Sequence, residues 1–340
     1  MIRNLFRILL MVLLFSAILP CLFSQGTESD RIRIMFYNVE NFFDIKDDSL
    51  NNDEDFLPDG VMRWNYSRYN KKYNSLYKTI VSAGEWNIPD IIAFCEVENR
   101  KILQDLLFNT YLSKCEFGIV HEESSDLRGI DVCLIYNKKS IELLGYRYLI
   151  PENIKEFHTR SVLYSCFLVN TDTIHLFVNH WPSRRGGSLA GEDLRISIAT
   201  MVHEVCDSVF RVTSGMAKII ICGDFNSTPG DIEIETLLNS DFSSSKLINL
   251  AENLAAKGEG SYRYKGIWEM IDQVIVSESL INNESGLGTA INYFRIFKPG
   301  FLLEKDPLYP GSSPFSTYRG YRYHGGYSDH LPVLLDLITK

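Results

Sequence analysis

The sequence predicts an α/β fold in which helices lie outside two packed sheets of mainly antiparallel or mixed strands. Two observations lead to this prediction. Strand-like apolar runs recur along the chain, and most are continuously apolar rather than alternating, as in strands buried on both faces. Segments between them carry apolar residues at intervals of three and four, the spacing of an amphipathic helix. Two sheets packed on each other accommodate this many strands.

The predicted elements follow in chain order. The strand-like runs are 31–39, 90–97, 130–136, 141–149, 161–170, 173–179, 218–222, 270–277, 293–298 and 332–338. Helical spacing is clearest at Tyr69, Tyr73, Leu76 and Ile80, and again at Ile198, Val202, Val205 and Val209. The neighbouring runs within 130–149, and those within 161–179, are close enough to form two hairpins.

The first residues predict export. Arg3 and Arg7 precede an apolar run, 8–19, that is too short for a transmembrane helix, which needs about 20 residues. A basic start followed by such a run is typical of a secretory signal peptide. We therefore expect residues 1–24 to be a signal peptide and residues 25–340 to form a single catalytic domain without a transmembrane span. The mature protein would be periplasmic or extracellular.

Cys21 offers a second interpretation of the N-terminus, as the anchoring residue of a bacterial lipoprotein. Pro20 is unfavourable directly before a lipidated cysteine, so we favour cleavage before Gln25. Both interpretations place the protein outside the cytoplasm.

Composition and charge exclude several classes. The chain has 340 residues, of which 45% are hydrophobic and 12% aromatic, too apolar for an intrinsically disordered protein. No segment repeats with a fixed period, which argues against solenoids and propellers. A net charge of −9 argues against tight general binding of nucleic acid through the overall field. A polyanionic substrate would therefore need a local basic patch or metal ions.

Several of the apolar runs end in a cluster of polar residues. The clusters occupy 38–41, 95–99, 179–181, 223–226 and 328–330, the last directly before the final run. Ligand sites collect at strand ends, where loops present side chains from several strands. The carboxylates and amides among these residues favour a hard cation such as Mg²⁺, with Mn²⁺ or Ca²⁺ as alternatives. The two histidines are not at zinc-protease spacing and are better suited to acid–base chemistry.

These motifs resemble those of the endonuclease/exonuclease/phosphatase superfamily. The matching residues are Asn38-Val39, Glu96, Asn179-His180, Gly223-Asp224-Phe225-Asn226, Ile271-Asp272-Gln273-Val274 and Ser328-Asp329-His330-Leu331-Pro332-Val333. Pancreatic deoxyribonuclease, abasic-site endonucleases, neutral sphingomyelinases and inositol polyphosphate 5-phosphatases belong to that superfamily. The order of the motifs is the same, and they span nearly the whole chain after residue 37. The resemblance implies a four-layer α/β/β/α sandwich.

The resemblance also implies the metal and phosphate ligands. Glu96 corresponds to the principal metal ligand, with Asn38 beside it contacting metal or phosphate. Asp329 corresponds to a residue at the metal edge of the site. Asn226 corresponds to the residue that holds the scissile phosphate.

The proton-transfer residues follow in the same way. His330 corresponds to the base for the attacking water, oriented by Asp272, and Asp224 to a group that positions or activates that water. His180 matches the histidine that stabilises or protonates the leaving group. The resemblance leaves open which of Asp224 and His330 takes the proton.

Other candidate contacts have two interpretations each. Arg184 lies in a basic, glycine-rich loop, 181–187, that we expect to face a phosphate. Arg128 is suited either to clamping a phosphate or to a surface turn in which Asp131 pairs with a local amide. The segment 318–327 interleaves aromatic residues with arginine, and we favour substrate contact over a packed loop.

Structural roles also explain some of the residues beside these polar clusters. We expect Asn99 to cap a helix that begins just after it. Glu40 and Asn41 are equally suited to supporting the site and to a purely structural role.

The sequence thus predicts an exported, metal-dependent phosphodiesterase, with a nuclease acting on DNA or RNA as the first hypothesis. The alternative is a phosphoesterase for lipid or inositol phosphate headgroups, although no Trp-Cys-Asp-Arg tetrad occurs and no apolar hairpin suited to membrane insertion is evident. A non-catalytic binding protein would be indicated by loss of Glu96, His180, Asp224 or His330, and all four are present. Nucleic acid is the expected partner, as substrate, and no stable protein partner is predicted.

Overall fold

The computed structural model describes residues 31–152, 154, 158–184, 189–239, 246–283 and 285–339. The predicted signal peptide, its cleavage site and Cys21 lie outside these residues, so the division of the chain at residue 24 stays a prediction. Among the described residues, no helix combines the length and apolar character needed to cross a membrane.

The first large sheet has seven strands and contains both ends of the described chain. Its order is β13 (Leu287–Gly288), β19 (Val333–Thr339), β1 (Arg31–Phe42), β2 (Ile91–Val97), β4 (Asp131–Asn137) and β3 (Phe117–Val120), with β14 (Phe294–Ile296) also pairing with β19. Only the β1–β2 pair is parallel. The sheet is therefore mixed, as predicted.

The second large sheet has six strands. Its order is β5 (Glu142–Leu149), β6 (Val162–Val169), β7 (Asp172–His180), β8 (Lys218–Asp224), β12 (Asp272–Ser277) and β9 (Leu247–Asn249). Here β7 and β8 run parallel, and the other neighbours are antiparallel.

One of the two predicted hairpins is confirmed and the other is wrong. β6 and β7 pair directly, as the spacing within 161–179 predicts. β4 and β5 belong to different sheets, so the chain passes from the first sheet to the second within 130–149 and forms no hairpin there. The reason is burial: Ile141, at the turn between them, joins the apolar core between the two sheets.

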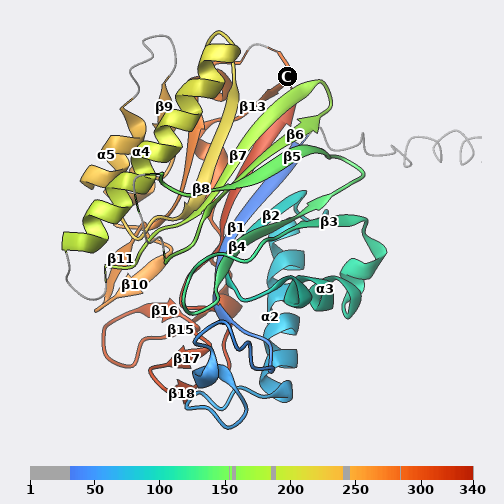
Figure 1. Ribbon diagram of the computed structural model, residues 1–340, viewed down its shortest axis with the longest axis vertical. Coiled ribbons are helices and arrows are strands. Elements are labelled where there is room, and N and C mark those ends of the chain that lie inside the picture. The colour runs from blue at the N-terminus through green and yellow to red at the C-terminus, as the bar shows by residue number, and fades with distance from the viewer. Residues whose placement is uncertain are drawn as a thin grey trace, which may run out of the picture.

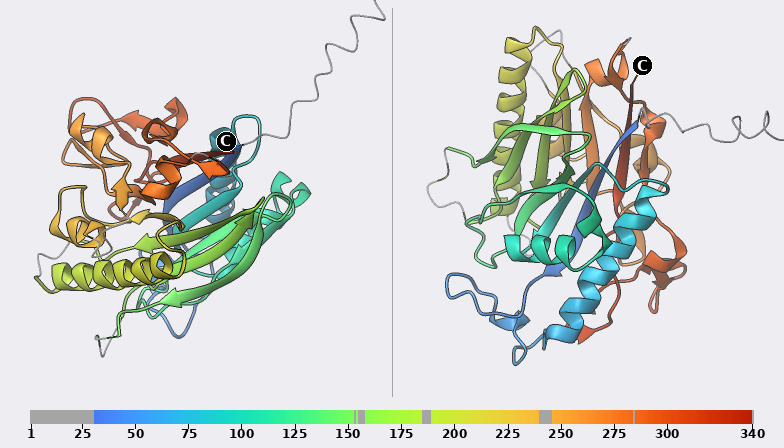
Figure 2. Two further views of the ribbon diagram at one scale, coloured as in Figure 1. Left: turned by 90° about the horizontal axis from the view of Figure 1, so that it is seen from above. Right: turned by 90° about the vertical axis from the view of Figure 1, so that its right-hand side faces the viewer.

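Four layers result from how alternate side chains of each strand are buried (Figures 1 and 2). Ile34 and Phe36 of β1 face the core between the sheets, whereas Met35 and Tyr37 face a core beneath two helices. Those helices are α2 (Tyr66–Gly84) and α3 (Arg100–Phe108), which cover the first sheet. α4 (Leu189–Val212) and α5 (Ile232–Leu238) cover the second sheet over a third core. The α/β/β/α sandwich is thus present.

Short elements fill the connections between these layers. They are η2 (Glu54–Phe56), η3 (Tyr111–Lys114), α6 (Glu252–Ala256), β10 (Tyr262–Tyr264), β11 (Ile267–Glu269), α7 (Glu278–Ile281), η4 (Ile291–Tyr293), η5 (Gly300–Leu302), β15 (Leu303–Lys305), β16 (Ser312–Pro314), β17 (Tyr318–Arg319) and β18 (Arg322–Tyr323). β10 and β11 form a two-stranded hairpin that stands outside both large sheets. Apolar periodicity does not predict segments this short, because each holds fewer than two turns or two pleats.

Packing between the sheets gives a direct test of the fold. Phe167 of β6 is fully buried there, with its ring centroid 5.5 Å from that of Tyr136 on β4. We expect Phe167→Ala to lower the free energy of unfolding by about 3–5 kcal/mol, because a large cavity opens in the core. Urea denaturation measures the change. Phe108→Ala, at the end of α3 where the ring is 72% exposed, is the control and should stay within about 0.5 kcal/mol of wild type.

Candidate active site

Strand register aligns three of the candidate side chains at one edge of the second sheet. His180, the last residue of β7, is paired with Asp224, the last residue of β8. Asp272, the first residue of β12, is paired with Asp224 from the other side. A side chain on Gly223 would not fit there, since its Cβ would lie 2.3 Å from the carbonyl oxygen of Asn179. The backbones of β7 and β8 therefore approach closely at the site.

The first sheet contributes Asn38 from β1 and Glu96 from β2. Glu96 has a positive φ of 63° at an irregularity between Cys95 and Val97, where the pairing of β2 with β4 shifts register. A left-handed backbone at a glutamate costs about 1–3 kcal/mol, and such strain is commonly found at functional sites. The bulge redirects the carboxylate, whose oxygens accept from Asn38 Nδ2 at 3.3 Å and from the backbone N of Asn41 at 2.7 Å.

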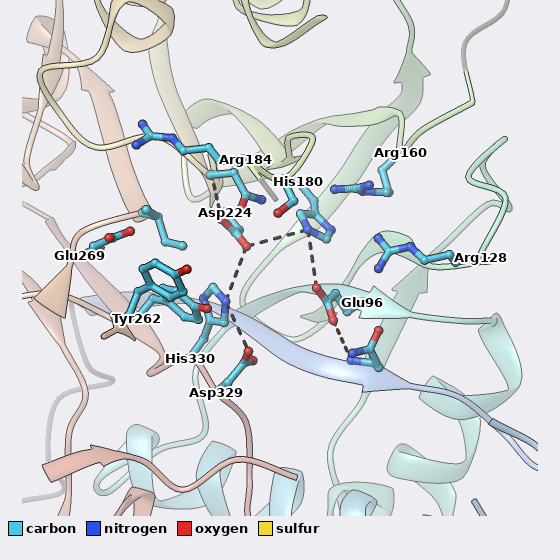
Figure 3. A pocket seen from close by; sticks show the side chains of 15 residues that line it. Glu96, Arg128, Arg160, His180, Arg184, Asp224, Tyr262, Glu269, Asp329 and His330 are labelled. Carbon is cyan, nitrogen blue, oxygen red and sulfur yellow. Dashed lines mark hydrogen bonds and ion pairs between the residues drawn. The ribbon is translucent and has the colours of Figure 1, made fainter. Parts of the chain in front are cut away.

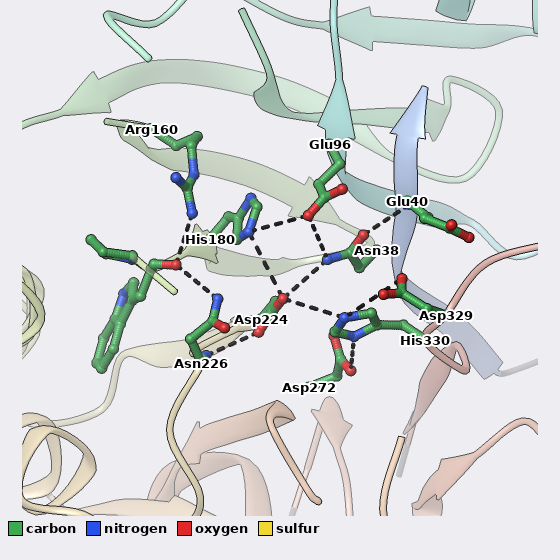
Figure 4. A network of polar contacts seen from close by, with 12 residues as sticks. Asn38, Glu40, Glu96, Arg160, His180, Asp224, Asn226, Asp272, Asp329 and His330 are labelled. Atoms are coloured by element: carbon green, nitrogen blue, oxygen red, sulfur yellow. Dashed lines mark hydrogen bonds and ion pairs between the residues drawn. The ribbon is translucent and has the colours of Figure 1, made fainter. Parts of the chain in front are cut away.

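Asp224 lies at the centre of the resulting network (Figure 4). Its Oδ2 accepts from Asn38 Nδ2 at 3.0 Å and lies 3.8 Å from Nε2 of both His180 and His330. Its Oδ1 accepts from the backbone N of Asn226 at 2.9 Å. Burial raises the pKa of Asp224 to about 7. The charge of His330 lowers this pKa, and the neighbouring Asp272 carboxylate raises it further.

His330 is held by a buried carboxylate. Its Nδ1 lies 2.7 Å from Asp272 Oδ2, which also accepts from the Ser261 hydroxyl, and its ring packs against Tyr262 at 4.8 Å between centroids. Burial alone would lower the pKa of His330. The carboxylates of Asp272 and Asp224 outweigh burial and hold that pKa well above its usual value. His330 is therefore an imidazolium at neutral pH.

His180 has the opposite character. Burial, reinforced by the cations of Arg160 and Arg128, lowers the pKa of His180 well below its usual value. Its Nε2 lies 3.7 Å from Glu96 Oε1. The pKa values of the two imidazoles on either side of Asp224 are therefore shifted in opposite directions.

A pocket of about 600 Å³ opens over this network (Figure 3). Arg128 and Arg160 line the wall beside His180, and Arg184 lies near Asp224. Tyr262, Tyr264 and Glu269 of the β10–β11 hairpin line the opposite wall. The structure thus brings all the predicted site residues to this pocket or directly beneath it: Glu96, Arg128, His180, Arg184, Asp224, Asn226, Asp329 and His330 line it, while Asn38 and Asp272 contact these residues from below.

The three arginines are held to different degrees. Arg160 is buried, with Nη1 3.0 Å from Asp126 Oδ2 and Nη2 donating to the Trp181 carbonyl oxygen at 2.8 Å. Arg184 pairs with Asp231. Arg128 is half-exposed, its Nε 3.5 Å from Asp126. The predicted pairing of Asp131 with a local amide is confirmed, because Asp131 accepts from the Ser124 backbone N. Arg128 lines the pocket, and its contact with a phosphate stays a prediction.

None of the residues 318–327 lines this pocket, so the predicted substrate contact of the segment finds no support there and stays a prediction. Tyr318 is buried and donates from its hydroxyl to the Met62 carbonyl oxygen at 3.0 Å, and Arg319 pairs with Glu304. Glu40 accepts from the backbone amides of Thr317 and Tyr318 at 2.6 and 2.9 Å, so its role is to fix this loop. The start of the segment is packed as in the second interpretation, whereas Tyr321 and Arg322 are exposed.

Aromatic residues at the pocket come instead from β10, which the sequence analysis did not identify. Tyr262, Arg263 and Tyr264 alternate aromatic and basic residues in the same way as 318–327. That alternation is the sequence pattern by which this part of the pocket could have been predicted. The expected helix cap is confirmed: Asn99 Oδ1 accepts from the backbone N of Ile102 at the start of α3.

The donor set fits a hard divalent cation. Glu96, Asp224 and Asp329 present carboxylates, which are oxygen ligands of the kind that Mg²⁺, Mn²⁺ and Ca²⁺ take. The expected contact of Asn38 with the metal is not supported, because its Nδ2 faces Glu96 and Asp224 while its Oδ1 accepts from the Glu40 backbone N. Ligand atoms of Asp224, Asp272 and His330 also lie within 4.8 Å of one another. Because Oδ2 of Asp272 is engaged by His330 and Ser261, the Glu96 side of the pocket is the better place for an ion.

A family model described as the endonuclease/exonuclease/phosphatase family matches residues 33–339. No curated protein sequence matches the chain. Among solved structures, zebrafish TDP2 complexed with single-strand DNA product superimposes with a TM-score of 0.53 at 11% identity, covering 91% of this chain and 99% of that one.

Two further structures share the fold. The human Nocturnin catalytic domain with bound sulfate anion has a TM-score of 0.54 at 16% identity, covering 92% of this chain and 96% of that one. A mannosyl-6-phosphatase from Bacteroides thetaiotaomicron has a TM-score of 0.56 at 15% identity, covering 90% of this chain and 99% of that one. At these identities the likeness concerns the fold.

The charge state of His330 depends on Asp272, which is testable without turnover. We expect Asp272→Asn to lower the pKa of His330, because the substitution removes the negative charge facing Nδ1. NMR titration of the imidazole Cε1 proton measures that pKa. His175 on β7, whose pKa burial lowers, is the internal reference and should keep its wild-type pKa. An unchanged His330 would contradict the role of Asp272 as its partner.

Proposed function

The chain belongs to the endonuclease/exonuclease/phosphatase family, and we propose that it is an exported, metal-dependent phosphodiesterase that hydrolyses DNA or RNA. One observation carries the proposal above all. Glu96, His180, Asp224 and His330 come from both sheets and meet around a single pocket with arginines on its wall. Negative charge, acid–base groups and cations are thereby placed within reach of one phosphate.

In the proposed reaction Asp224 accepts the proton of the attacking water. The sequence left the choice between Asp224 and His330 open, and the charges favour Asp224. His330 already carries a proton at neutral pH, because Asp272 and Asp224 raise its pKa. Asp224, with a pKa of about 7, is a carboxylate of suitable basicity in the middle of the network.

The two histidines stabilise charge in different places. His330, fixed by Asp272 at 2.7 Å, presents a positive Nε2–H to the phosphate oxygens. The lowered pKa of His180 favours its neutral form, which stabilises the leaving oxygen by donating a hydrogen bond from a ring N–H. The leaving oxygen takes its proton from solvent, and Asp224 returns to solvent the proton that it took from the attacking water. Asn226, whose Nδ2 donates to the Trp181 carbonyl at 2.9 Å, borders the same space and helps to hold the scissile phosphate.

Glu96 and Asp329 would hold Mg²⁺, or Mn²⁺ or Ca²⁺ in its place, and Asn38, whose Nδ2 donates to Glu96, would orient that carboxylate. When bound there, the cation neutralises charge on the phosphate. Asn38 links this position to the base, since its amide donates to both Glu96 and Asp224.

The pocket walls support a nucleic acid substrate. Tyr262 and Tyr264 offer faces on which a base can stack, and Arg128 and Arg184 can contact flanking phosphates. The net charge of −9 argues against a long duplex track, so we propose that a short or flexible strand is engaged. A neighbour of the same fold is complexed with single-strand DNA product, which is consistent with this choice.

A headgroup phosphoesterase is the second candidate. A volume of about 600 Å³ is within the range of small-molecule sites and admits a sugar or inositol phosphate as well as a nucleotide. A phosphatase among the structures of similar fold keeps this candidate in the test.

Substitution of Glu96 tests whether a measured hydrolysis comes from the candidate site. We expect Glu96→Ala to abolish metal-dependent turnover, whereas His330→Ala should keep metal binding and lose several orders of magnitude in rate. The assay presents plasmid DNA, single-stranded DNA, RNA, sphingomyelin and sugar and inositol phosphates with Mg²⁺, Mn²⁺ or Ca²⁺. Nucleic acid cleavage lost in Glu96→Ala supports the nuclease; headgroup release alone supports the second candidate.

Glu98→Gln is the matched control for this experiment. Burial raises the pKa of Glu98 to about 8, so its carboxyl is largely protonated at neutral pH and the amide replaces a neutral group. We expect near-wild-type turnover. Equal activity in Glu96→Ala and Glu98→Gln would refute the site.

The pH profile distinguishes the two possible bases. Because burial raises the pKa of Asp224 to about 7, protonation below that pH removes the base, and kcat/KM should rise with pH and level off near or just above 7. Initial rates on a chromogenic phosphodiester between pH 5 and 9 measure the profile. A rise that continues well above pH 8 would indicate His330 as the base instead, because its pKa is held far above the usual value.

A further inference from the structure

A second cluster of metal-ligating side chains lies on the segment that leads into β4. His121, Glu123 and Asp131 each offer one ligand atom, and these atoms lie within 4.8 Å of one another. None of the three lines the catalytic pocket. The proposed mechanism therefore does not use this cluster.

The two buried members face each other without a hydrogen bond. The side chains of His121 and Asp131 are only 2% and 1% exposed, and His121 Nε2 lies 3.1 Å from Asp131 Oδ2. Within the described residues neither of these two atoms has a hydrogen-bond partner. Buried polar atoms are nearly always satisfied, so this pair calls for an explanation.

The geometry around Asp131 leaves one oxygen for a ligand. Its Oδ1 accepts from the backbone N of Ser124 at 2.8 Å, which fixes the carboxylate and aims Oδ2 at His121. Two ligand atoms that are each about 2.1 Å from a zinc ion and 3.1 Å from each other subtend about a right angle at the ion. That angle is within the range of metal coordination.

Glu123 closes the cluster on the solvent side. Its side chain is 57% exposed, and it offers a carboxylate oxygen within 4.8 Å of the ligand atoms of His121 and Asp131. Its ion-pair contact with His121, at 3.9 Å, is to Nδ1 and not to the Nε2 that faces Asp131. A bound ion would have an exposed fourth position reached past Glu123.

We propose that His121, Glu123 and Asp131 form a second divalent metal site, of the zinc class, separate from the catalytic metal. One imidazole nitrogen with two carboxylates suits Zn²⁺ better than Mg²⁺, which prefers oxygen alone. The Asp131–Ser124 bond is an outer contact that orients a ligand, as such sites commonly have.

The ion would position the arginine wall of the pocket. Asp126 and Arg128 lie on the segment between Glu123 and Asp131, and Asp126 binds Arg160. Bridging the two ends of this segment with a metal restricts the backbone that carries Asp126 and Arg128. The site is therefore structural, and its residues are positioning residues.

Zinc binding to the purified full chain tests the site independently of any activity. In a Glu96→Ala background with excess Mg²⁺, EDTA-treated protein is titrated with Zn²⁺ by calorimetry, and bound metal is counted after dialysis. We expect one equivalent that depends on His121, and binding about tenfold weaker or more in both His121→Gln and Glu123→Gln. Zn²⁺ should also raise the Tm of the parent protein and not that of these variants.

The controls separate binding from folding. Glu122→Gln changes an exposed carboxylate next to the cluster and should bind Zn²⁺ like the parent. Glu123 is exposed enough for Glu123→Gln to fold even if His121→Gln does not, and circular dichroism checks both. The same Zn²⁺ stoichiometry and affinity in Glu123→Gln as in Glu122→Gln would overturn the proposal. Because no substrate is used, this result is independent of whether the protein is a nuclease.

Discussion

The buried carboxylate of Asp224 is the constraint on which the candidate site depends. It ends a central strand of the second sheet, yet it accepts a hydrogen bond from Asn38 of the first sheet, so it joins the two sheets at the rim of their shared core. A buried carboxylate is costly unless its neighbours compensate it. His330, Asn38 and the backbone amide of Asn226 compensate the Asp224 carboxylate. Because they come from different elements, their positions around Asp224 depend on how the two sheets pack.

Charged neighbours differentiate two chemically identical side chains that are buried alike. His180 and His330 lie at equal distances from Asp224 Oδ2, but the cations of Arg160 and Arg128 act on His180, whereas the Asp272 carboxylate lies against Nδ1 of His330. One imidazole is therefore neutral and the other charged at neutral pH. A site that handles a phosphate needs both a cation and an uncharged donor, and the sandwich supplies them from the ends of different strands.

Local sequence patterns were reliable where the contacts are local and unreliable where they are not. The Asn99 cap and the β6–β7 hairpin involve residues near each other in the chain, and both are confirmed. The hairpin predicted within 130–149 is wrong for this reason. Its two strands have suitable local properties, but partners distant in the chain decided in which sheet each strand pairs.

The sequence by itself determined the fold class and the candidate residues, because continuous apolar runs are typical of buried strands and polar clusters marked where those runs end. It also supplied the motif order that matches the family. Only the tertiary structure decided which histidine is charged, that Tyr262 and Tyr264 line the pocket, and that His121 meets Asp131. These properties depend on burial and on distances between side chains far apart in sequence, and no local pattern encodes either.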